Sequence, residues 1–430
     1  MEKKGKVMMV MMMWVLLVLV LISISGSSAA ANQQQHKDKK QTIPSLSLHR
    51  IGSSAVFPLR GNVYPEGYYY VAVSVGTPPK PYFLDIDTGS DLTWLQCDAP
   101  CVNCHKAPHP PFRPNKNSIV ACSDPICSAI QPQDSNYRCE DPREQCDYEV
   151  AYADQAVSLG VLVRDVFPLR LNNGSIVVPR LVFGCGYDQQ VSDPTISNTD
   201  GVLGLGNGES SIVSQLRKFG ITQNVIGHCM SAHGGGFLFF GDDLVPSSGV
   251  VWTPMSRSRS SDKHYSPGPA ELVYGTKSTG VKGLITIFDS GSSYTYFNLQ
   301  AYQAFISSIR KDLNGKPLKA VDDETLPVCW KGKKPFKSLQ DVKKYFSPVI
   351  LNFNGKKAKL VIPPEAYMII TSHGNVCLGI LNGSEVGLED LNIIGDISLQ
   401  DLLVIYDNEK QQIGWVPKDC TRLPKSGSAL

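Results

Sequence analysis

The chain has 430 residues, a length that suits two domains, and a hydrophobic fraction of 42%, which is enough for a large core. It carries 41 Lys and Arg against 39 Asp and Glu, for a formal charge of +2. So even a balance argues against nucleic acid or an anionic membrane surface as the partner.

The first 31 residues have the pattern of a secretory signal peptide. Three lysines within the first six residues precede an apolar run over residues 7–24, and small residues follow at 27–31. Because this run approaches the length that spans a bilayer, an uncleaved signal anchor stays open as an alternative. N-glycosylation sequons at Asn173 and Asn382, both in turn-forming sequence, agree with a secretory-pathway protein.

Twelve cysteines in a chain with a secretory signal predict a disulfide framework. Eight of them fall between Cys97 and Cys185, and spacing alone does not fix their pairing. Cys97, Cys101, Cys104 and His105 form an alternative set of zinc ligands, but their spacing does not match paired C-x-x-C knuckles. Since an oxidising compartment favours disulfides, we expect neither a metal nor another cofactor.

The first chemically distinctive stretch follows a segment over residues 32–60, which we interpret as a propeptide or an N-terminal arm. Aromatic and β-branched residues over 67–76 predict a strand, a Pro turn follows, and residues 82–86 predict a second, apolar strand. This hairpin delivers Asp87 to the mouth of a buried strand. Gly89 lets the backbone turn tightly there, and the neighbouring hydroxyls can donate to the carboxylate.

A second copy of this arrangement ends in Asp289, behind an apolar run over residues 284–288. One copy alone would most simply be a β-turn that begins with Asp. Two copies, each behind an apolar strand, instead favour two carboxylates that face each other across a cleft. Like charges held that close do not both ionise easily, so the pair would share one proton.

The remaining elements give the two halves a similar plan. Residues 148–167 predict a hairpin with Tyr152 near the turn, and residues 210–219 predict a short helix capped by its first residue. In each half an apolar-apolar-Gly segment follows the Asp turn after a long interval, at 202–204 and at 393–395. This weak internal symmetry is typical of a duplicated lobe.

Over residues 64–420 the chain resembles the pepsin-like aspartic peptidases, most closely the cysteine-rich plant branch of nucellin-like and nepenthesin-like enzymes. The motifs that carry the resemblance are Asp87-Thr88-Gly89-Ser90 with Trp94 downstream, Tyr152 before Gly160, Asp200-Gly201-Val202-Leu203-Gly204, Asp289-Ser290-Gly291-Ser292 and Ile393-Ile394-Gly395-Asp396. The resemblance implies an all-β (mainly), bilobal pepsin-like fold with a deep cleft between the lobes and a flap hairpin. Its parts would be an N-terminal lobe (61–255) with a cysteine-rich insertion (97–146), a C-terminal lobe (256–420) and a tail (421–430).

The resemblance also implies roles for the site residues. It makes Asp87 and Asp289 the catalytic dyad and Tyr152 the flap tyrosine, with Trp94 as its hydrogen-bond partner. The supporting residues of the two turns would be Thr88, Gly89, Ser90, Ser290, Gly291 and Ser292. Among these, the serine at the end of each turn would donate to the outer carboxylate oxygen, and the residue after each Asp would interlock the two turns.

The disulfides that the resemblance implies are Cys97–Cys101, Cys104–Cys185, Cys122–Cys146, Cys127–Cys139, Cys229–Cys420 and Cys329–Cys377. Three positions depart from the family pattern: Ala153 stands where pepsin has Gly, Ser290 where many relatives have Thr, and Asn298 where many have Pro. None of these departures removes a catalytic group, but Ala153 bears on the mobility or specificity of the flap.

The activity that follows is that of an aspartic endopeptidase, which hydrolyses peptide bonds at acidic pH with a water activated by the dyad. We expect protein or peptide substrates, inhibition by pepstatin-like compounds and a monomeric state. The alternative is a catalytically inactive secreted protein of this fold that binds or inhibits other proteins. Relatives of that kind usually lack one Asp or its turn, and both turns are intact here. The expected destination is extracellular, in the cell wall, with the vacuole or a signal-anchored membrane location as alternatives.

Two other classes of hydrolase are disfavoured. The run His233-Gly234-Gly235-Gly236 resembles an oxyanion-hole motif of lipases, but the chain contains no G-x-S-x-G. We therefore interpret the run as a tight hairpin turn. A zinc peptidase is disfavoured because the chain contains no H-E-x-x-H.

Overall fold

The computed structural model describes residues 53–424 except 100, 132–137, 154, 191–197 and 257–263. The predicted signal peptide and residues 32–52 of the predicted arm therefore lie outside the described residues. Strands predominate in the described part, so the prediction of a mainly β fold is confirmed. The described residues contain no helix that is both long enough and apolar enough to cross a membrane.

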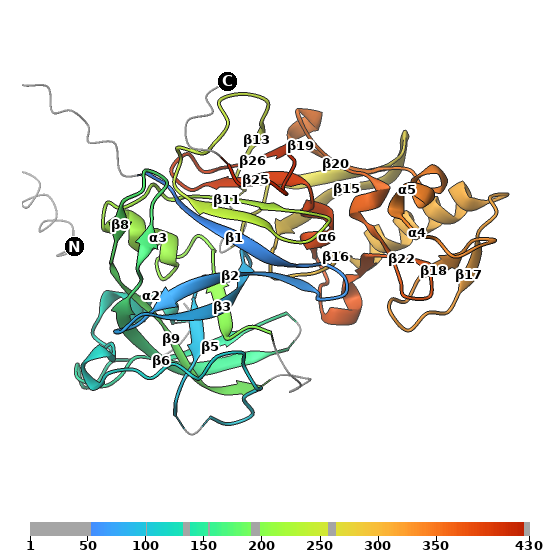
Figure 1. Cartoon of the computed structure of the whole chain (residues 1–430). Coiled ribbons are helices and arrows are strands. Elements are labelled where there is room, and N and C mark those ends of the chain that lie inside the picture. The colour runs from blue at the N-terminus through green and yellow to red at the C-terminus, as the bar shows by residue number, and fades with distance from the viewer. Residues whose placement is uncertain are drawn as a thin grey trace, which may run out of the picture. The chain divides into compact units, whose positions relative to one another are not determined.

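Thirteen strands form one sheet that draws on both halves of the chain (Figure 1). In spatial order they are β13 (Val251–Pro254), β26 (Gln412–Pro417), β25 (Leu402–Asp407), β11 (Val225–Met230), β12 (Gly236–Phe240), β1 (Ala55–Asn62), β2 (Tyr68–Val75), β3 (Lys80–Asp87), β10 (Gly201–Gly204), β4 (Trp94–Gln96), β9 (Arg180–Gln190), β6 (Val157–Val166) and β5 (Asp147–Ala151). Strand β1 pairs with β2 and β12, so the predicted boundary at residue 60 falls inside a strand of this sheet.

The C-terminal lobe is built on a second sheet, of seven strands. These are β20 (Ala358–Ile362), β19 (Val349–Phe353), β14 (Pro269–Tyr274), β15 (Lys277–Phe288), β24 (Leu391–Ile394), β16 (Thr295–Phe297) and β23 (Ile380–Asn382). A four-stranded sheet of β17 (Lys319–Val321), β18 (Cys329–Lys331), β22 (Val376–Leu378) and β21 (Met368–Ile370) belongs to the same lobe. Strands β7 (Leu169–Arg170) and β8 (Ile176–Val177) form a short ribbon in the N-terminal lobe.

The two large sheets present the predicted carboxylates in the same way. Strand β3 ends at Asp87 and pairs in parallel with β10, where Gly204 lies opposite Asp87. Strand β15 ends just before Asp289 and pairs in parallel with β24. Each half thus lays its apolar-apolar-Gly segment along the strand that carries its Asp, as the predicted internal symmetry requires.

The described helices are α2 (Pro125–Ile130), α3 (Ile212–Lys218), α4 (Leu299–Leu313), α5 (Leu339–Val342) and α6 (Asp396–Leu399). The predicted helix over 210–219 is α3, but its N-cap is Ser211, whose hydroxyl accepts from the amide of Ser214 at 3.2 Å. The predicted cap is therefore wrong by one position. Helix α4 follows Asn298, whose side chain accepts from the amide of Ala301 at 3.0 Å. The departure from Pro at this position supplies an N-cap.

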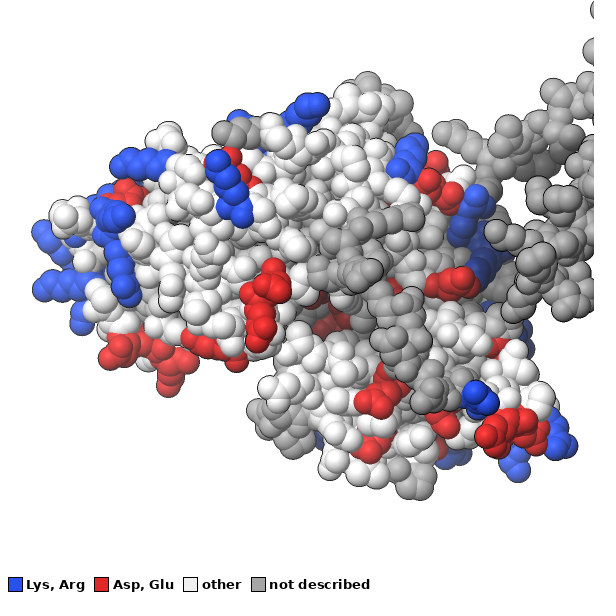
Figure 2. Space-filling model, turned by 180° about the vertical axis from the view of Figure 1, so that it is seen from behind, with Lys and Arg blue, Asp and Glu red and all other residues white. Residues whose placement is uncertain are grey.

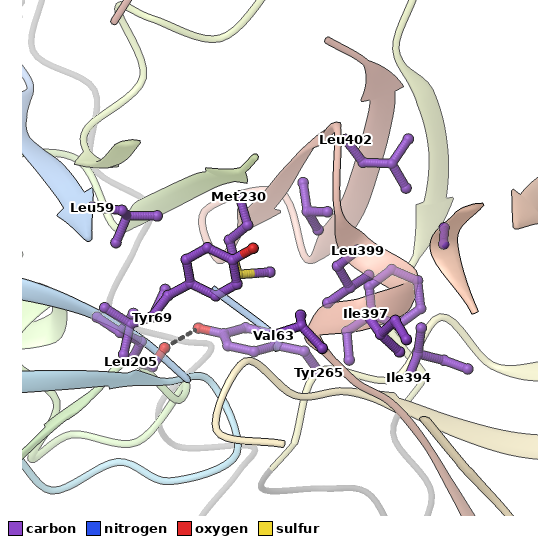
Figure 3. Close-up of a cluster of buried hydrophobic side chains, with 14 of the residues drawn as sticks. Leu59, Val63, Tyr69, Leu205, Met230, Tyr265, Ile394, Ile397, Leu399 and Leu402 are labelled. Atoms are coloured by element: carbon purple, nitrogen blue, oxygen red, sulfur yellow. Dashed lines mark hydrogen bonds between the residues drawn. The ribbon is translucent and has the colours of Figure 1, made fainter. Parts of the chain in front are cut away.

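A continuous hydrophobic core joins the two halves of the chain. Its centre is shown in Figure 3 and includes Leu59, Val63, Tyr69, Leu205, Met230, Tyr265, Ile394, Ile397, Leu399 and Leu402. The hydroxyl of Tyr265 donates to the carbonyl oxygen of Leu205 at 3.0 Å within this cluster (Figure 3). Burial of each such side chain contributes about 2 kcal/mol, so the floor shared by the two Asp-bearing sheets is well anchored.

Six disulfides are present. Two of the predicted pairs, Cys229–Cys420 and Cys329–Cys377, are confirmed. The other four predictions are wrong, because the observed pairs are Cys97–Cys185, Cys101–Cys104, Cys122–Cys139 and Cys127–Cys146. All four corrected pairs involve the cysteine-rich insertion.

Strand pairing explains these connections. Strand β4 lies parallel to β9, and the amide of Cys97 donates to the carbonyl oxygen of Gly186 at 2.8 Å. This register places the Cα atoms of Cys97 and Cys185 5.3 Å apart, a normal separation for a disulfide. Helix α2 likewise places Cys127 5.7 Å from Cys146, just ahead of β5. The three cysteines of the alternative zinc set are all disulfide-bonded, which removes them as thiolate ligands.

The surface is hollowed between the lobes. Figure 2, which views the molecule from behind, shows a notch between the C-terminal lobe and the part of the N-terminal lobe that carries β5, β6 and β9. Several Lys and Arg side chains lie at the far end of the C-terminal lobe, away from this notch (Figure 2). In this view these basic side chains therefore do not line the hollow.

Candidate active site

The first carboxylate lies at the end of β3 in a turn that surrounds it with donors. Asp87 is only 6% exposed. The amide of Gly89 donates to its Oδ1 atom at 2.8 Å, and the hydroxyl of Ser90 donates to its Oδ2 atom. Both donors favour the ionised form of the carboxyl.

The second carboxylate repeats this arrangement. Asp289 follows β15 directly, the amide of Gly291 donates to its Oδ1 atom at 2.9 Å, and the hydroxyl of Ser292 donates to its Oδ2 atom at 3.1 Å. The same kinds of donor thus approach the same oxygens in both turns. The structure brings the two predicted Asp residues and their two serines into one symmetrical site.

The residues that follow the two Asp residues interlock the turns. The hydroxyl of Thr88 donates to the carbonyl oxygen of Phe288 at 3.0 Å and accepts from the amide of Ser290 at 2.9 Å. Reciprocally, the hydroxyl of Ser290 donates to the carbonyl oxygen of Ile86 at 2.9 Å and accepts from the amide of Thr88 at 3.1 Å. All four bonds are buried, and each contributes about 1 kcal/mol. Ser290 therefore makes both crossing bonds with its hydroxyl although it lacks the methyl group of Thr.

Each turn needs a glycine because the carboxylate of the opposite turn lies too close for a Cβ atom. A Cβ atom on Gly89 would lie 2.7 Å from Oδ1 of Asp289, and one on Gly291 would lie 2.5 Å from Oδ1 of Asp87. Neither glycine has the positive φ that normally selects for this residue. The predicted reason, a tight backbone turn, is therefore replaced by close approach of the two carboxylates to the opposite turns.

Burial and mutual repulsion act on the protonation of the pair. Burial, followed by the negative charge of Asp289, raises the pKa of Asp87 to about 7, against the opposing effect of the Ser90 and Gly89 donors. A hydrogen bond between the two side chains adds to the increase, because it favours the form that keeps a proton. Asp87 therefore keeps a proton in acid, and the hydrogen bond lets Asp289 share it.

A hairpin lies over the first carboxylate. Strands β5 and β6 pair antiparallel, and Tyr152 follows the end of β5. The indole Nε1 of Trp94 donates to the hydroxyl oxygen of Tyr152 at 2.7 Å. Burial and the negative charge of Asp87 raise the pKa of Tyr152 well above its usual range, so this hydroxyl keeps its proton. The predicted flap tyrosine and Trp94 thus meet beside the dyad, with the exposed Ala153 next in the chain.

A buried histidine, His228, is linked to the interlock between the turns through Tyr406. The Nε2 atom of His228 lies 3.0 Å from the hydroxyl oxygen of Tyr406, and that hydroxyl forms a hydrogen bond with the Thr88 side chain. Burial lowers the pKa of His228 to about 3. The neutral imidazole can therefore donate through Nε2 to Tyr406, which in turn donates to Thr88. Neither residue was predicted, because their strands are far from either Asp turn in the sequence.

Two further carboxyls, neither of them predicted as a site residue, lie near the dyad. Burial and the charges of Asp87 and Asp289 hold the pKa of Asp85 well above its usual range. Burial, together with the charges of Asp85, Asp289 and Asp87, does the same for the pKa of Asp396. The period-two alternation of β3 was the signal that could have placed Asp85 on the same face as Asp87.

The glycosylation sites stay predictions. Asn173 is exposed in the turn between β7 and β8, and its side chain accepts from the hydroxyl of Ser175 at 2.7 Å. Asn382 ends β23, is partly buried, and accepts from the hydroxyl of Ser384 at 2.9 Å.

Both halves of the chain match models of known protein families. Family models described as "Xylanase inhibitor N-terminal" and "Xylanase inhibitor C-terminal" match residues 69–242 and 271–417. The chain is 46% identical over 390 residues to an aspartic proteinase of Oryza sativa subsp. japonica, and the match covers 88% of this chain and 94% of that protein. It is 28% identical to aspartic proteinase nepenthesin-1 of Nepenthes gracilis over 83% of this chain and 78% of that protein.

Solved structures share the fold. Basic 7S globulin from soybean superposes with a TM-score of 0.66 at 19% identity, over 85% of this chain and 95% of the globulin. The aspartic proteinase from Irpex lacteus superposes with a TM-score of 0.60 at 17% identity, over 87% of this chain and all of that protein. The bilobal, mainly β fold predicted from the motifs is therefore confirmed.

Proposed function

Because the chain belongs to the plant pepsin-like aspartic proteinase family, we propose that it is an aspartic endopeptidase that cleaves peptide bonds at acidic pH. The observation that carries this proposal is the pair of Asp87 and Asp289, each with its full set of donors and each against the glycine of the opposite turn. The 46% identity to a protein named as an aspartic proteinase supports it.

The proposed reaction needs one proton shared by the two carboxyls. The ionised carboxylate removes a proton from a water molecule as the water oxygen attacks the carbonyl carbon of the scissile bond. The protonated partner donates its proton to the carbonyl oxygen, which gives a neutral gem-diol. The carboxyl that took the water proton then protonates the amide nitrogen, and the other, now ionised, takes a proton from one hydroxyl of the gem-diol. The carbon–nitrogen bond breaks, an amine and a carboxylic acid are released, and the pair again holds one proton. No covalent bond to the protein forms.

The surrounding residues would hold this geometry. The donors from Gly89, Ser90, Gly291 and Ser292 engage both oxygens of each carboxyl and fix its plane. The interlock between the turns fixes the distance between the two carboxyls. Tyr152, held by Trp94, would close over a bound peptide and exclude water from the floor.

A second candidate function is a catalytically inactive protein that binds or inhibits another protein. The observation that favours it is the description of the matching family models, which name a xylanase inhibitor. Intact Asp turns with all their donors weigh against it, because a pure binding protein has no need of a shared-proton pair.

Acid cleavage of a generic protein substrate by the purified protein, with and without pepstatin, separates the two functions. The proposal expects cleavage in acid that pepstatin blocks and that Asp87→Asn abolishes. Cleavage that persists at a near-normal rate in Asp87→Asn, or no cleavage by the unmodified protein at any acidic pH, would overturn it.

The proposed setting is the secretory pathway, with removal of residues 1–31 and an extracellular destination in the cell wall; vacuolar and signal-anchored forms are the alternatives. Six disulfides, one of them between Cys229 and Cys420 far apart in the chain, support an oxidising compartment. Protein or peptide substrates and a monomeric state complete the proposal.

A further inference from the structure

A third carboxyl shares a strand and a face with the first member of the dyad. Asp85 lies two residues before Asp87 on β3, and alternate residues of a strand point to the same side. The rise along a strand separates the two positions by about 6.6 Å. A side chain of a bound peptide that reaches Asp87 can therefore also reach Asp85.

The register of the sheet places Asp85 on the face that the flap hairpin covers. Asp85 lies opposite Tyr70 of β2 and Val202 of β10, and Val202 lies opposite Trp94 of β4. Residues paired directly across neighbouring strands share a face, so Asp85 and Trp94 are in one row, two strands and about 10 Å apart. Since Trp94 holds the flap residue Tyr152, the row faces the space between sheet and flap.

The carboxyl of Asp85 is not satisfied by the protein around it. Asp85 is partly buried, and its Oδ1 atom has no hydrogen-bond partner among the described residues. The interaction that favours its ionised form comes from the backbone N–H of Ile86. Most buried polar atoms have a partner, so an unmatched oxygen beside the dyad is suited to a group that arrives with the substrate.

The charges that act most strongly on Asp85 are negative, and the cation in the same row is the exposed Arg60, which lies opposite Tyr70 and over the ring of Phe83. The carboxyls that repel the charge of Asp85 are those of Asp87 at the end of β3, Asp289 in the turn after β15 and Asp396 in α6. Asp396 is 1% exposed, and both of its oxygens lack a hydrogen-bond partner among the described residues. From β2, the neighbouring titratable groups are the hydroxyls of Tyr68 and Tyr70. Four neighbouring carboxyls outnumber the cation of Arg60, so the surroundings of Asp85 favour a positive charge.

We propose that Asp85 is a specificity-determining residue that receives the ammonium or guanidinium group of a substrate Lys or Arg side chain next to the scissile bond. This inference rests on the proposed peptidase function, and it names the substrate side chain that the residues around Asp85 would select. A cation would supply the missing donor to Oδ1 and offset the repulsion among the four carboxyls. The ring of Tyr70, directly across from Asp85, offers a face for the cation or its apolar stem.

An apolar side chain at this position would be selected against. It would bring no donor to the Oδ1 atom, which already lacks a partner among the described residues, whereas a cation would supply one. The preference should also depend on pH, because the empty Asp85 carboxyl keeps its proton in acid and a bound cation favours the ionised form. Selectivity for Lys over Leu should therefore increase as the pH increases within the active range.

The test uses peptides that are identical except for Lys or Leu at one position on either side of the scissile bond. The ratio of kcat/KM for the Lys peptide to that for the Leu peptide is measured for the unmodified protein, for Asp85→Asn and for Asp85→Leu. Asp242→Leu is the matched control, since Asp242 is exposed in the turn after β12. A ratio is used because it is independent of the fraction of active protein.

At one position we expect the unmodified protein to favour Lys, and Asp85→Leu to reduce the ratio by about tenfold or more. Asp85→Asn should give an intermediate ratio, and Asp242→Leu should leave it unchanged. In the unmodified protein the ratio should increase with pH within the active range, a measurement that requires no variant.

A ratio that is the same in the unmodified protein and Asp85→Leu, or one that does not change with pH, would overturn this inference while leaving the peptidase function intact. Absence of any pepstatin-sensitive cleavage would instead overturn the proposed function and, with it, the inference.

Discussion

The buried His228 should make the protein less stable in the acid in which we propose that it works. In the folded chain burial lowers the pKa of His228 to about 3, whereas an unfolded histidine has a pKa of about 6.5. Between these values the unfolded state binds one more proton than the folded state, so the free energy of unfolding decreases as the pH decreases. At pH 4, about 2.5 pH units below the pKa of an unfolded histidine, this effect has lowered the free energy of unfolding by about 3 kcal/mol.

Substitution of His228 by Gln tests this reasoning. Gln cannot take up a proton, so the variant lacks the acid penalty, but it loses the contact with Tyr406 at a cost of about 1–2 kcal/mol at every pH. We therefore expect His228→Gln to be less stable than the unmodified protein at pH 7 and more stable at pH 4.

The assay is urea unfolding at both pH values with the disulfides intact, in which the shift of the midpoint gives the change in stability. His233→Gln, at an exposed histidine of the turn between β11 and β12, is the control and should leave the midpoints unchanged. Equal destabilisation by His228→Gln at pH 7 and pH 4 would refute the argument, since it would mean that the folded state binds as many protons as the unfolded state.

Four further predictions follow from the site. The value of kcat/KM should fall as the pH rises through about 7, because Asp87, whose pKa is raised to about 7, then loses the proton that the pair needs; a rate that rises through pH 7 would contradict this. Ser290→Ala should lower the free energy of unfolding by about 2–4 kcal/mol, because it removes two of the four interlocking bonds, whereas Ser290→Thr should retain them; denaturant midpoints compare the two. Gly291→Ala should reduce kcat by about a hundredfold, because its Cβ atom would displace Oδ1 of Asp87, and unchanged turnover would refute the close approach. If a propeptide is removed, N-terminal sequencing should place the new terminus between residues 32 and 53, because the amide of Ser54 already donates to Asp243 at 3.0 Å and β1 begins at residue 55; a terminus inside β1 would contradict the sheet.

Local sequence signals predicted the parts of the site that are close together in the chain. Each Asp turn places its carboxylate and its donors within four residues, so Ser90 and Ser292 could be recognised without knowledge of the fold. The disulfides show the opposite case. The pairing of Cys97 depends on the parallel register between β4 and β9, which are far apart in the sequence, and the resemblance to other proteins implied a different partner.

The same distinction explains what was missed around the dyad. The two turn glycines were named from the sequence, but the structure gives them a different reason, which is the close approach of a carboxylate from the other half of the chain. His228 and Tyr406 come from strands that become neighbours only in the large sheet. Asp85 is different, because the sequence alone could have indicated it. It lies two residues before Asp87, which places both on one face of the strand, and a carboxyl within an apolar strand is unusual.

The large sheet also explains why a peptidase of this kind would need both ends of its chain. Strand β25 carries Tyr406 and pairs with β11, which carries His228, and the pair reaches Thr88 at the centre of the interlock. The disulfide between Cys229 and Cys420 joins β11 to the segment that follows β26, close to these contacts. At the other end, β1 completes the sheet between β2 and β12. The interlock is therefore supported by β11 and β25, which lie far from both Asp turns in the sequence.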